Sequence, residues 1–96
     1  MLKIYKQHKA EDDLINIWLY SFNSYGETKA DTYLDELEQT INRLADHPRL
    51  GTRCDYIRKG YMKIPVNKHI VFYRLESDKI HVIRVLHKSM LPQNYL

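Results

Sequence analysis

Basic side chains are interleaved with aromatic and β-branched residues between Tyr56 and Met90, and this is where the sequence could do chemistry. Cleavage of RNA through its 2′-hydroxyl needs a base for the hydroxyl proton, cations for the phosphate and an acid for the leaving oxygen. The residues that could fill these roles are Lys63, Arg74, Arg84, His87, Lys88 and, as an acid or base in the tail, Tyr95.

The same residue types also suit purely structural roles. An arginine in a central strand, such as Arg84, could pair with a helix carboxylate such as Asp35 or Glu38. Tyr61 and Tyr73 could stack on nucleic-acid bases, or they could cover the edges of a core or contact a protein partner. Both interpretations stay open from the sequence.

Other reactive constellations are not supported. His81 and His87 lie six residues apart on one strand face, which is too far for one metal ion. The consecutive carboxylates of residues 11–13 point in different directions from a helix, and they predict a solvated first turn. Cys54 is the only cysteine, so no internal disulfide can form and a reducing compartment is favoured. We expect no metal and no cofactor.

Composition indicates one small domain spanning residues 1–96. The net charge of +3 and the pI of about 9.0 suit an acidic partner, either a nucleic acid or an acidic protein. No apolar run approaches the roughly 18 residues of a membrane helix, and the N-terminus lacks a signal-peptide apolar region. We expect a cytoplasmic protein with no membrane segment.

Two helices should precede the strands. Apolar residues recur at spacings of three and four over Leu14–Tyr25, and Gly26 is placed to end this helix in a left-handed conformation. A second stripe covers Ala30–Ala45, with Thr28 and Asp31 as a capping pair. The short connection predicts a helical hairpin whose apolar stripes are buried against a sheet.

Four strands are expected to form that sheet. One is Leu2–Tyr5, and three more lie between Tyr56 and Met90, separated by polar turns at 67–68 and 76–79. If Glu76 pairs with Lys79, Ile70, Phe72, Ile83 and Val85 share the face under the helices, and Val71, Tyr73, Val82, Arg84 and Leu86 share the other.

The register of the Tyr61–Ile64 strand leaves two choices. The simplest two-residue turn would put Lys63 on the buried face beside Phe72, whereas a shift of one residue would bury Met62 and Ile64. We prefer the shift. It places Tyr61, Lys63, Tyr73 and Arg84 on one exposed face.

In order and spacing, these segments resemble the ParE branch of the RelE/ParE toxin superfamily over nearly the whole chain. The resemblance is carried by residues 57–61, 69–74 and 80–90, together with Trp18, Tyr25-Gly26 and the run Leu44–Pro48. Val82–Met90 is its most specific part. The resemblance implies an α+β fold, in which an N-terminal strand and an antiparallel helical hairpin pack on one face of a three- to four-stranded antiparallel sheet.

The resemblance also implies a function. ParE-like members are toxins of type II toxin–antitoxin systems that inhibit DNA gyrase by stabilising its cleaved DNA complex, and a cognate ParD-like antitoxin neutralises them. The alternative is a ribosome-dependent messenger-RNA endoribonuclease of the RelE kind, although the segment His87–Met90 is as in ParE-like members. A third reading is an inactive member that serves only as an antitoxin partner. We expect no catalysis and no sequence-specific DNA binding by the chain alone.

Two sets of contact residues are expected from this resemblance. The gyrase contacts would be Arg84, His87, Lys88 and Met90, with Tyr61 and Lys63 as further candidates. The antitoxin would lay an amphipathic helix in an apolar groove and an extended segment along the sheet. Its contacts would be Leu2, Tyr20, Phe22, Tyr73 and Leu91.

Overall fold

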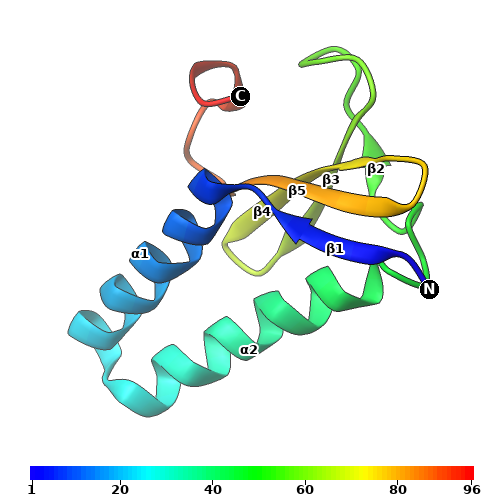
Figure 1. Ribbon diagram of the computed structural model, residues 1–96. Helices are drawn as coiled ribbons and strands as arrows, with labels where there is room; N and C mark the ends of the chain where they lie inside the picture. The colour runs from blue at the N-terminus through cyan, green and yellow to red at the C-terminus, as the bar shows by residue number, and fades with distance from the viewer.

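A five-stranded mixed sheet carries two helices on one face in the computed structural model, which describes all residues 1–96 (Figure 1). In the sheet the strands follow the order β1-β5-β4-β3-β2. The elements are β1 (Lys3–Lys6), α1 (His8–Tyr25), α2 (Glu27–Arg43), β2 (Thr52–Arg53), β3 (Tyr61–Val66), β4 (His69–Leu75), β5 (Lys79–His87) and the short terminal helix η1 (Pro92–Asn94). The predicted α+β fold is confirmed. The sheet is larger than predicted, and it is mixed because β1 runs parallel to β5.

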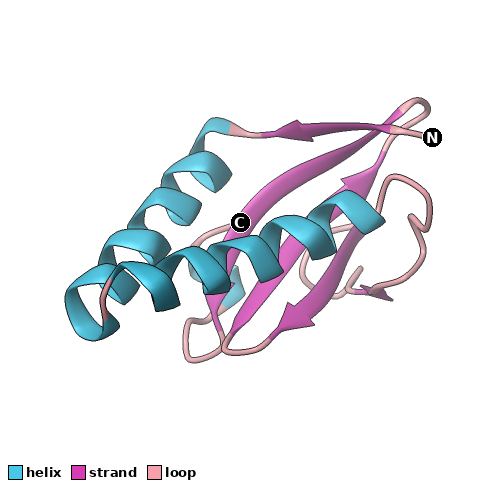
Figure 2. Cartoon of the chain, turned by 90° about the horizontal axis from the view of Figure 1, so that it is seen from below, coloured by secondary structure: helices cyan, strands magenta, loops and turns pink.

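The two helices are joined at Gly26, and both lie over the same side of the sheet (Figure 2). Gly26 ends α1 with a positive φ of 92°, as predicted, and its N–H bonds to the carbonyl of Phe22. Its ψ of 175° keeps it outside the left-handed helical region. The predicted cap of α2 by Thr28 and Asp31 is wrong, because both residues lie inside the helix. Asp31 instead accepts a hydrogen bond from the Trp18 indole at 2.8 Å.

A two-residue turn joins β3 to β4, and Asn67 takes the positive φ of 54° that such a turn requires. Lys63 therefore lies opposite Phe72, and the one-residue shift preferred from the sequence is wrong. Met62 and Ile64 nevertheless pack towards the helices, because Phe72 belongs to the cluster on the far side of the sheet.

A β-bulge interrupts the β4–β5 ladder, and it affects only part of the predicted assignment of the strand faces. Tyr73 pairs with Val82, but its neighbour Phe72 pairs with Arg84, so Ile83 is the extra residue. One extra residue exchanges the two faces of the strand beyond it. Ile70, Phe72 and Ile83, predicted under the helices, pack on the far side, whereas Val71, Tyr73 and Val82 pack beneath the helices, so the predicted choice of face is wrong for them. Val85 and Leu86 lie as predicted because they come after the extra residue of β5.

Apolar cores therefore form on both sides of the sheet. Under the helices, buried residues from both helices and the strands β3, β4 and β5 meet: Ala10, Leu14, Leu37, Ile41, Leu44, Val66, Val71, Tyr73, Ile80, Val82 and Val85. The far-side cluster consists of Cys54, Tyr61, Phe72, Ile83 and Leu86, against which Ile57 and the C-terminal Met90 and Leu96 pack. Tyr61 is only 6% exposed and Tyr73 is fully buried, so the predicted exposure of these two tyrosines is wrong. Neither helix is long and apolar enough to span a membrane.

Candidate functional site

Arg84, the central cation of the predicted site, is held in an ion pair. Its Nε and Nη2 donate to the two carboxylate oxygens of Asp13 in α1 at 2.8 and 2.9 Å. The Arg84 and Asp13 side chains are 14% and 13% exposed, and the hydrogen bond to Asp13 raises the pKa of Arg84 above its usual value. The expectation of an exposed Arg84 is therefore wrong. A helix carboxylate does pair with it, but from the first helix rather than Asp35 or Glu38.

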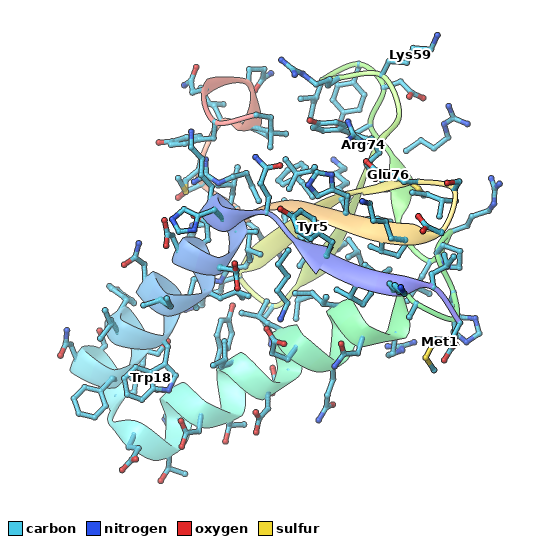
Figure 3. All side chains as sticks on the ribbon, viewed as in Figure 1. Met1, Tyr5, Trp18, Lys59, Arg74 and Glu76 are labelled. Carbon is cyan, nitrogen blue, oxygen red and sulfur yellow. The ribbon has the colours of Figure 1, made fainter.

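Two further candidate cations are also engaged by neighbours. The Nζ of Lys63 donates to the hydroxyl of Tyr56 at 2.9 Å and lies over that ring. Arg74 donates to one carboxylate oxygen of Glu76 through Nε and Nη2, and the two side chains lie together on the sheet (Figure 3). This contact with Arg74 lowers the pKa of Glu76. His81 also faces the Glu76 carboxylate at 3.3 Å, and Lys79 lies 3.5 Å from its other oxygen.

Tyr95, the candidate acid or base, is 41% exposed and lies beside Arg84. Its ring is 5.7 Å from the guanidinium carbon, and its main-chain carbonyl accepts from Nη1 of Arg84 at 3.2 Å. Arg84 thus connects three separate parts of the chain, namely α1, β5 and the C-terminal segment. The phosphate-binding cations of an RNA-cleaving site would have to be unpaired, and this one is not.

A groove of about 880 Å³ lies between α1, α2, the β3–β4 turn and the end of β5. Aromatic, apolar and polar side chains form its wall: Asp13, Asn16, Ile17, Tyr20, Ser21, Tyr25, Lys29, Tyr33, Glu36, Asn67, Lys68, His69, Val85, Leu86, His87 and Met90. A groove of this size and lining suits a protein segment or another amphipathic ligand.

One tyrosine and two histidines form the polar centre of the groove wall. The hydroxyl of Tyr33 lies 2.6 Å from Nδ1 of His69 and also accepts the N–H of Lys68 at 3.1 Å. Burial, together with the neighbouring His87, lowers the pKa of His69 to about 4, so His69 is neutral at pH 7. His87 packs edge-on against His69, with ring centroids 5.3 Å apart, and its Nδ1 accepts the N–H of Ser89.

The predicted gyrase contacts divide into two groups. His87 and Met90 line the groove, and His87 and Lys88 are exposed at the end of β5. Tyr61 is buried in the far-side cluster, so it is not available to a partner in this conformation. Lys63 is half-buried on Tyr56, as described above.

The predicted antitoxin contacts are scattered over the molecule. Tyr20 is 69% exposed and lines the groove. Phe22 stacks on Trp18 outside the groove, and Leu91 is exposed in the tail. Leu2 packs partly buried against the helix-side core. Tyr73 is fully buried, so its prediction as a surface contact is wrong.

Sequence reasoning missed Tyr33 and His69 as members of the groove wall. Tyr33 lies in the apolar stripe of α2, which predicts a position in the core. Its hydroxyl was the signal that one end of the side chain needs a polar partner. His69 is the first residue of β4, and nothing in the sequence around it predicts a place in a groove. No group of three or more histidine, cysteine or acidic side chains gathers as a metal site.

The fold and the groove define a class of small α+β proteins, and solved structures share this architecture. The structure from the chromosomal ParDE toxin–antitoxin system of P. aeruginosa matches it with a TM-score of 0.80 at 17% identity, covering 91% of this chain and 96% of that one. A YoeB/ParE toxin from Agrobacterium tumefaciens matches with a TM-score of 0.60 at 15% identity, over 90% of this chain and 98% of that one. At such identities these likenesses establish the fold alone.

Sequence comparison then gives the family. Residues 5–92 match the family model described as the ParE toxin of the type II toxin–antitoxin system, parDE. Toxin ParE1 of Mycobacterium tuberculosis (strain CDC 1551 / Oshkosh) is 42% identical over 82 residues, 84% of each chain. Toxin ParE1 of Caulobacter vibrioides is 39% identical over 88 residues, 92% of this chain and 91% of that one. The chain belongs to the ParE toxin family of type II toxin–antitoxin systems.

Proposed function

We propose that this toxin inhibits DNA gyrase by binding its cleaved DNA complex and stabilising it, without catalysis of its own. Family membership supports the toxin role. The observation that carries the choice against RNA cleavage is the pairing of Arg84 with Asp13. A cation already neutralised by a carboxylate contributes little to stabilising a phosphorane-like transition state. Arg74 is neutralised by Glu76 in the same way.

The proposed contacts with gyrase lie at the end of β5. His87 and Lys88 are exposed there, and Met90 follows on the groove wall. Methionine and histidine side chains at such a surface supply adaptable apolar and hydrogen-bonding contact. Arg84 supports this surface indirectly, because it ties the strand to Asp13 and to the tail.

The proposed antitoxin site is the groove itself. A ParD-like segment seated between α1 and the β3–β4 turn would contact Tyr20 and Tyr33. The same groove wall contains His87 and Met90. An antitoxin bound there therefore covers residues that the gyrase complex needs, and neutralisation follows from direct competition for one surface.

The test uses purified toxin, gyrase and supercoiled plasmid. Wild-type toxin should cause linear, cleaved plasmid to accumulate. The double substitution His87→Ala with Met90→Ala should lower this activity at least about tenfold, since two contacts of about 1 kcal/mol or more are removed. Leu19→Ala, at an apolar position on the outer side of α1 that is 45% exposed, is the matched control and should retain full activity.

Three results would contradict the proposal. If plasmid stays intact while translated messages are cut at the ribosome, the protein is a nuclease of the alternative kind. If neither assay responds and expression does not arrest growth, the chain is an inactive family member. If the control variant loses as much activity as the double variant, the end of β5 is not the contact surface.

The antitoxin site has its own test, with the cognate antitoxin titrated by calorimetry. Tyr20→Ala should weaken binding by about tenfold or more, because truncating a large aromatic contact removes 1 kcal/mol or more of binding free energy. Leu19→Ala should bind as wild type does. Equal affinities for all three proteins would place the antitoxin elsewhere.

A further inference from the structure

The two carboxylates on the groove wall both have partners within the chain. Asp13 accepts two hydrogen bonds from Arg84, whose positive charge offsets its own. Glu36 accepts a hydrogen bond from the side-chain amide of Asn67. This second contact leaves the charge of Glu36 in place, but it holds the carboxylate against the β3–β4 turn.

The two lysines on the same wall have no such partner. Lys29 and Lys68 are both exposed, and no carboxylate lies within 4.0 Å of either ammonium group. The ammonium of Lys29 lies 5.5 Å from the centre of the Tyr25 ring, a contact that leaves its charge unpaired. Once Arg84 is counted against Asp13, the ionised groups of the wall carry one positive charge in excess.

Tyr33 connects the positions of these two lysines. Lys29 precedes Tyr33 by four residues in α2, which is about one helical turn or roughly 6 Å along the axis. The hydroxyl of Tyr33 accepts the N–H of Lys68 at 3.1 Å. The two lysines therefore adjoin the same aromatic side chain, one along α2 and the other at the β3–β4 turn.

The polar neighbour of Tyr33 adds no charge at neutral pH. Nδ1 of His69 lies 2.6 Å from the Tyr33 hydroxyl, and burial together with His87 lowers the pKa of His69 to about 4. The permanent positive charges on this wall are thus those of Lys29 and Lys68. A partner segment in the groove meets aromatic and apolar surface with two unpaired ammonium groups beside it.

We propose that the groove selects an acidic antitoxin segment, and that Lys29 and Lys68 are the residues that determine this specificity. The inference rests on the proposed antitoxin site and deepens it. The segment packs apolar side chains on Tyr20 and Tyr33 and places one carboxylate beside each lysine. A neutral segment would desolvate the ammonium groups without pairing them, and a basic segment would be repelled, so both are disfavoured.

The first experiment titrates the cognate antitoxin by calorimetry at 50 and 500 mM salt. The double variant Lys29→Glu with Lys68→Glu should bind at least about tenfold more weakly than wild type at the lower salt, because two attractive contacts become repulsive. The deficit should shrink at the higher salt, where the screening length falls to roughly 4 Å.

The matched control is the double variant Lys9→Glu with Arg49→Glu. Both residues are exposed cations outside the groove with no ion pair, and the net charge changes equally. This control should lose less than about threefold in affinity at 50 mM salt, because only long-range attraction is affected. Equal losses in the two double variants would overturn the inference.

Glu36 supplies a test of the opposite sign. Its charge repels an acidic segment, so Glu36→Gln should tighten antitoxin binding by about two- to fivefold, as expected for one exposed charge interaction. The substitution keeps an acceptor for Asn67. Asp35→Asn, at an exposed neighbour outside the groove wall, should leave the affinity unchanged. A tighter complex cannot result from misfolding, and weaker binding by Glu36→Gln would contradict the proposed charge selection.

Charge reversal in the antitoxin identifies the paired carboxylates directly. Each acidic residue of its toxin-binding segment is replaced in turn by lysine. At least one replacement should weaken binding to wild-type toxin and restore binding to the Lys29→Glu, Lys68→Glu variant. The absence of any such restoration would exclude direct pairing.

A second copy of the toxin is the competing occupant of the groove. The helices α1 and α2 carry eight acidic against three basic residues, so another copy also offers carboxylates. Sedimentation of the toxin alone separates the two cases. The inference requires that the double variant leave the oligomeric state unchanged, and a dimer that dissociates on substitution of the two lysines would overturn it.

The inference and the proposed function can fail separately. If Tyr20→Ala weakens antitoxin binding while the lysine variant matches its control, the groove is the antitoxin site and only the charge selection fails. If Tyr20→Ala and the lysine variant both bind as wild type does, the antitoxin lies elsewhere and both fail. Gyrase inhibition is measured by plasmid cleavage without antitoxin, so its failure is seen independently.

Discussion

The carboxylate of Asp13 in α1 closes the edge of β5 and neutralises Arg84 at the same time. One of its oxygens accepts the main-chain N–H of Val85 at 2.9 Å as well as Nε of Arg84 at 2.8 Å. The neighbouring strand β1 pairs with β5 only as far as Val82. A helix side chain thus takes the place of a strand neighbour, which satisfies a backbone donor that the sheet leaves unpaired.

Removing this carboxylate should strongly destabilise the fold. Asp13→Ala leaves Arg84 without a partner in a site where both side chains are largely buried, and breaking such a pair lowers the free energy of unfolding by about 3 kcal/mol. Asp13→Asn keeps an acceptor for Val85 and should lose less. Urea denaturation measures both. Asp12→Ala, at an exposed neighbour, should stay within about 0.5 kcal/mol of wild type, and equal losses at 12 and 13 would contradict the role of the pair.

The buried hydroxyl of Tyr73 should contribute measurably to stability. It donates to the carbonyl of Pro48 at 2.9 Å and accepts the N–H of Gly51 at 3.0 Å, which anchors the loop after α2. Tyr73→Phe removes both bonds and should lower the free energy of unfolding by about 1–2 kcal/mol. Tyr25→Phe, whose ring is 60% exposed, is the control and should change nothing. A melting temperature unaltered by Tyr73→Phe would refute the assignment.

Acid should weaken the protein partly through His69. Because burial and His87 lower its pKa to about 4 in the fold, the unfolded chain binds the proton more readily between that value and about 6.5. The free energy of unfolding therefore rises with pH across this window and is lost as the pH falls through it. His69→Asn keeps an acceptor for the Tyr33 hydroxyl and does not titrate. Its melting temperature should fall less than that of wild type between pH 7 and pH 4, and parallel falls would exclude this contribution.

Cys54 should be chemically inert in the native protein. Its side chain is fully buried in the far-side cluster, and burial raises the pKa of its thiol. Reaction with a thiol-specific disulfide reagent at pH 8 should be roughly a hundredfold slower than in denaturant, since exposure of the thiol needs an opening free energy of about 3 kcal/mol. Rapid labelling of the folded protein would show that the loop carrying Cys54 opens easily.

Local pattern was sufficient to predict both helices and four of the five strands, but not the two-residue strand β2 or the short helix η1. Apolar spacing of three and four identified both helices, and Gly26 was correctly read as the residue that separates them. The β-branched and aromatic runs located the three long strands within a few residues. These local patterns predict structure reliably because each depends only on neighbours within one helical turn or one strand. The same segments, in order, carried the resemblance to the ParE family.

Only the tertiary structure decided what each strand face does. The bulge at Ile83 shifts one strand by a single residue, and with a side-chain period of two that shift exchanges the faces of the ladder beyond it. The sequence around Ile83 contains no glycine or proline from which a bulge could be predicted. Tyr61 and Tyr73, predicted to be exposed, are buried for a different reason, because both sides of the sheet are covered. Tyr73 packs under the helices, and Tyr61 packs in the far-side cluster.

The partner of Arg84 could likewise not be predicted from the sequence. Asp13 is 71 residues away, and it resembled any other carboxylate in the first turns of a helix. The pair forms because the end of β1 brings the start of α1 against the free edge of β5, and this geometry exists only once the sheet is assembled. Composition and periodicity fix which segments form, whereas the contacts between distant segments fix which charges remain free for a partner.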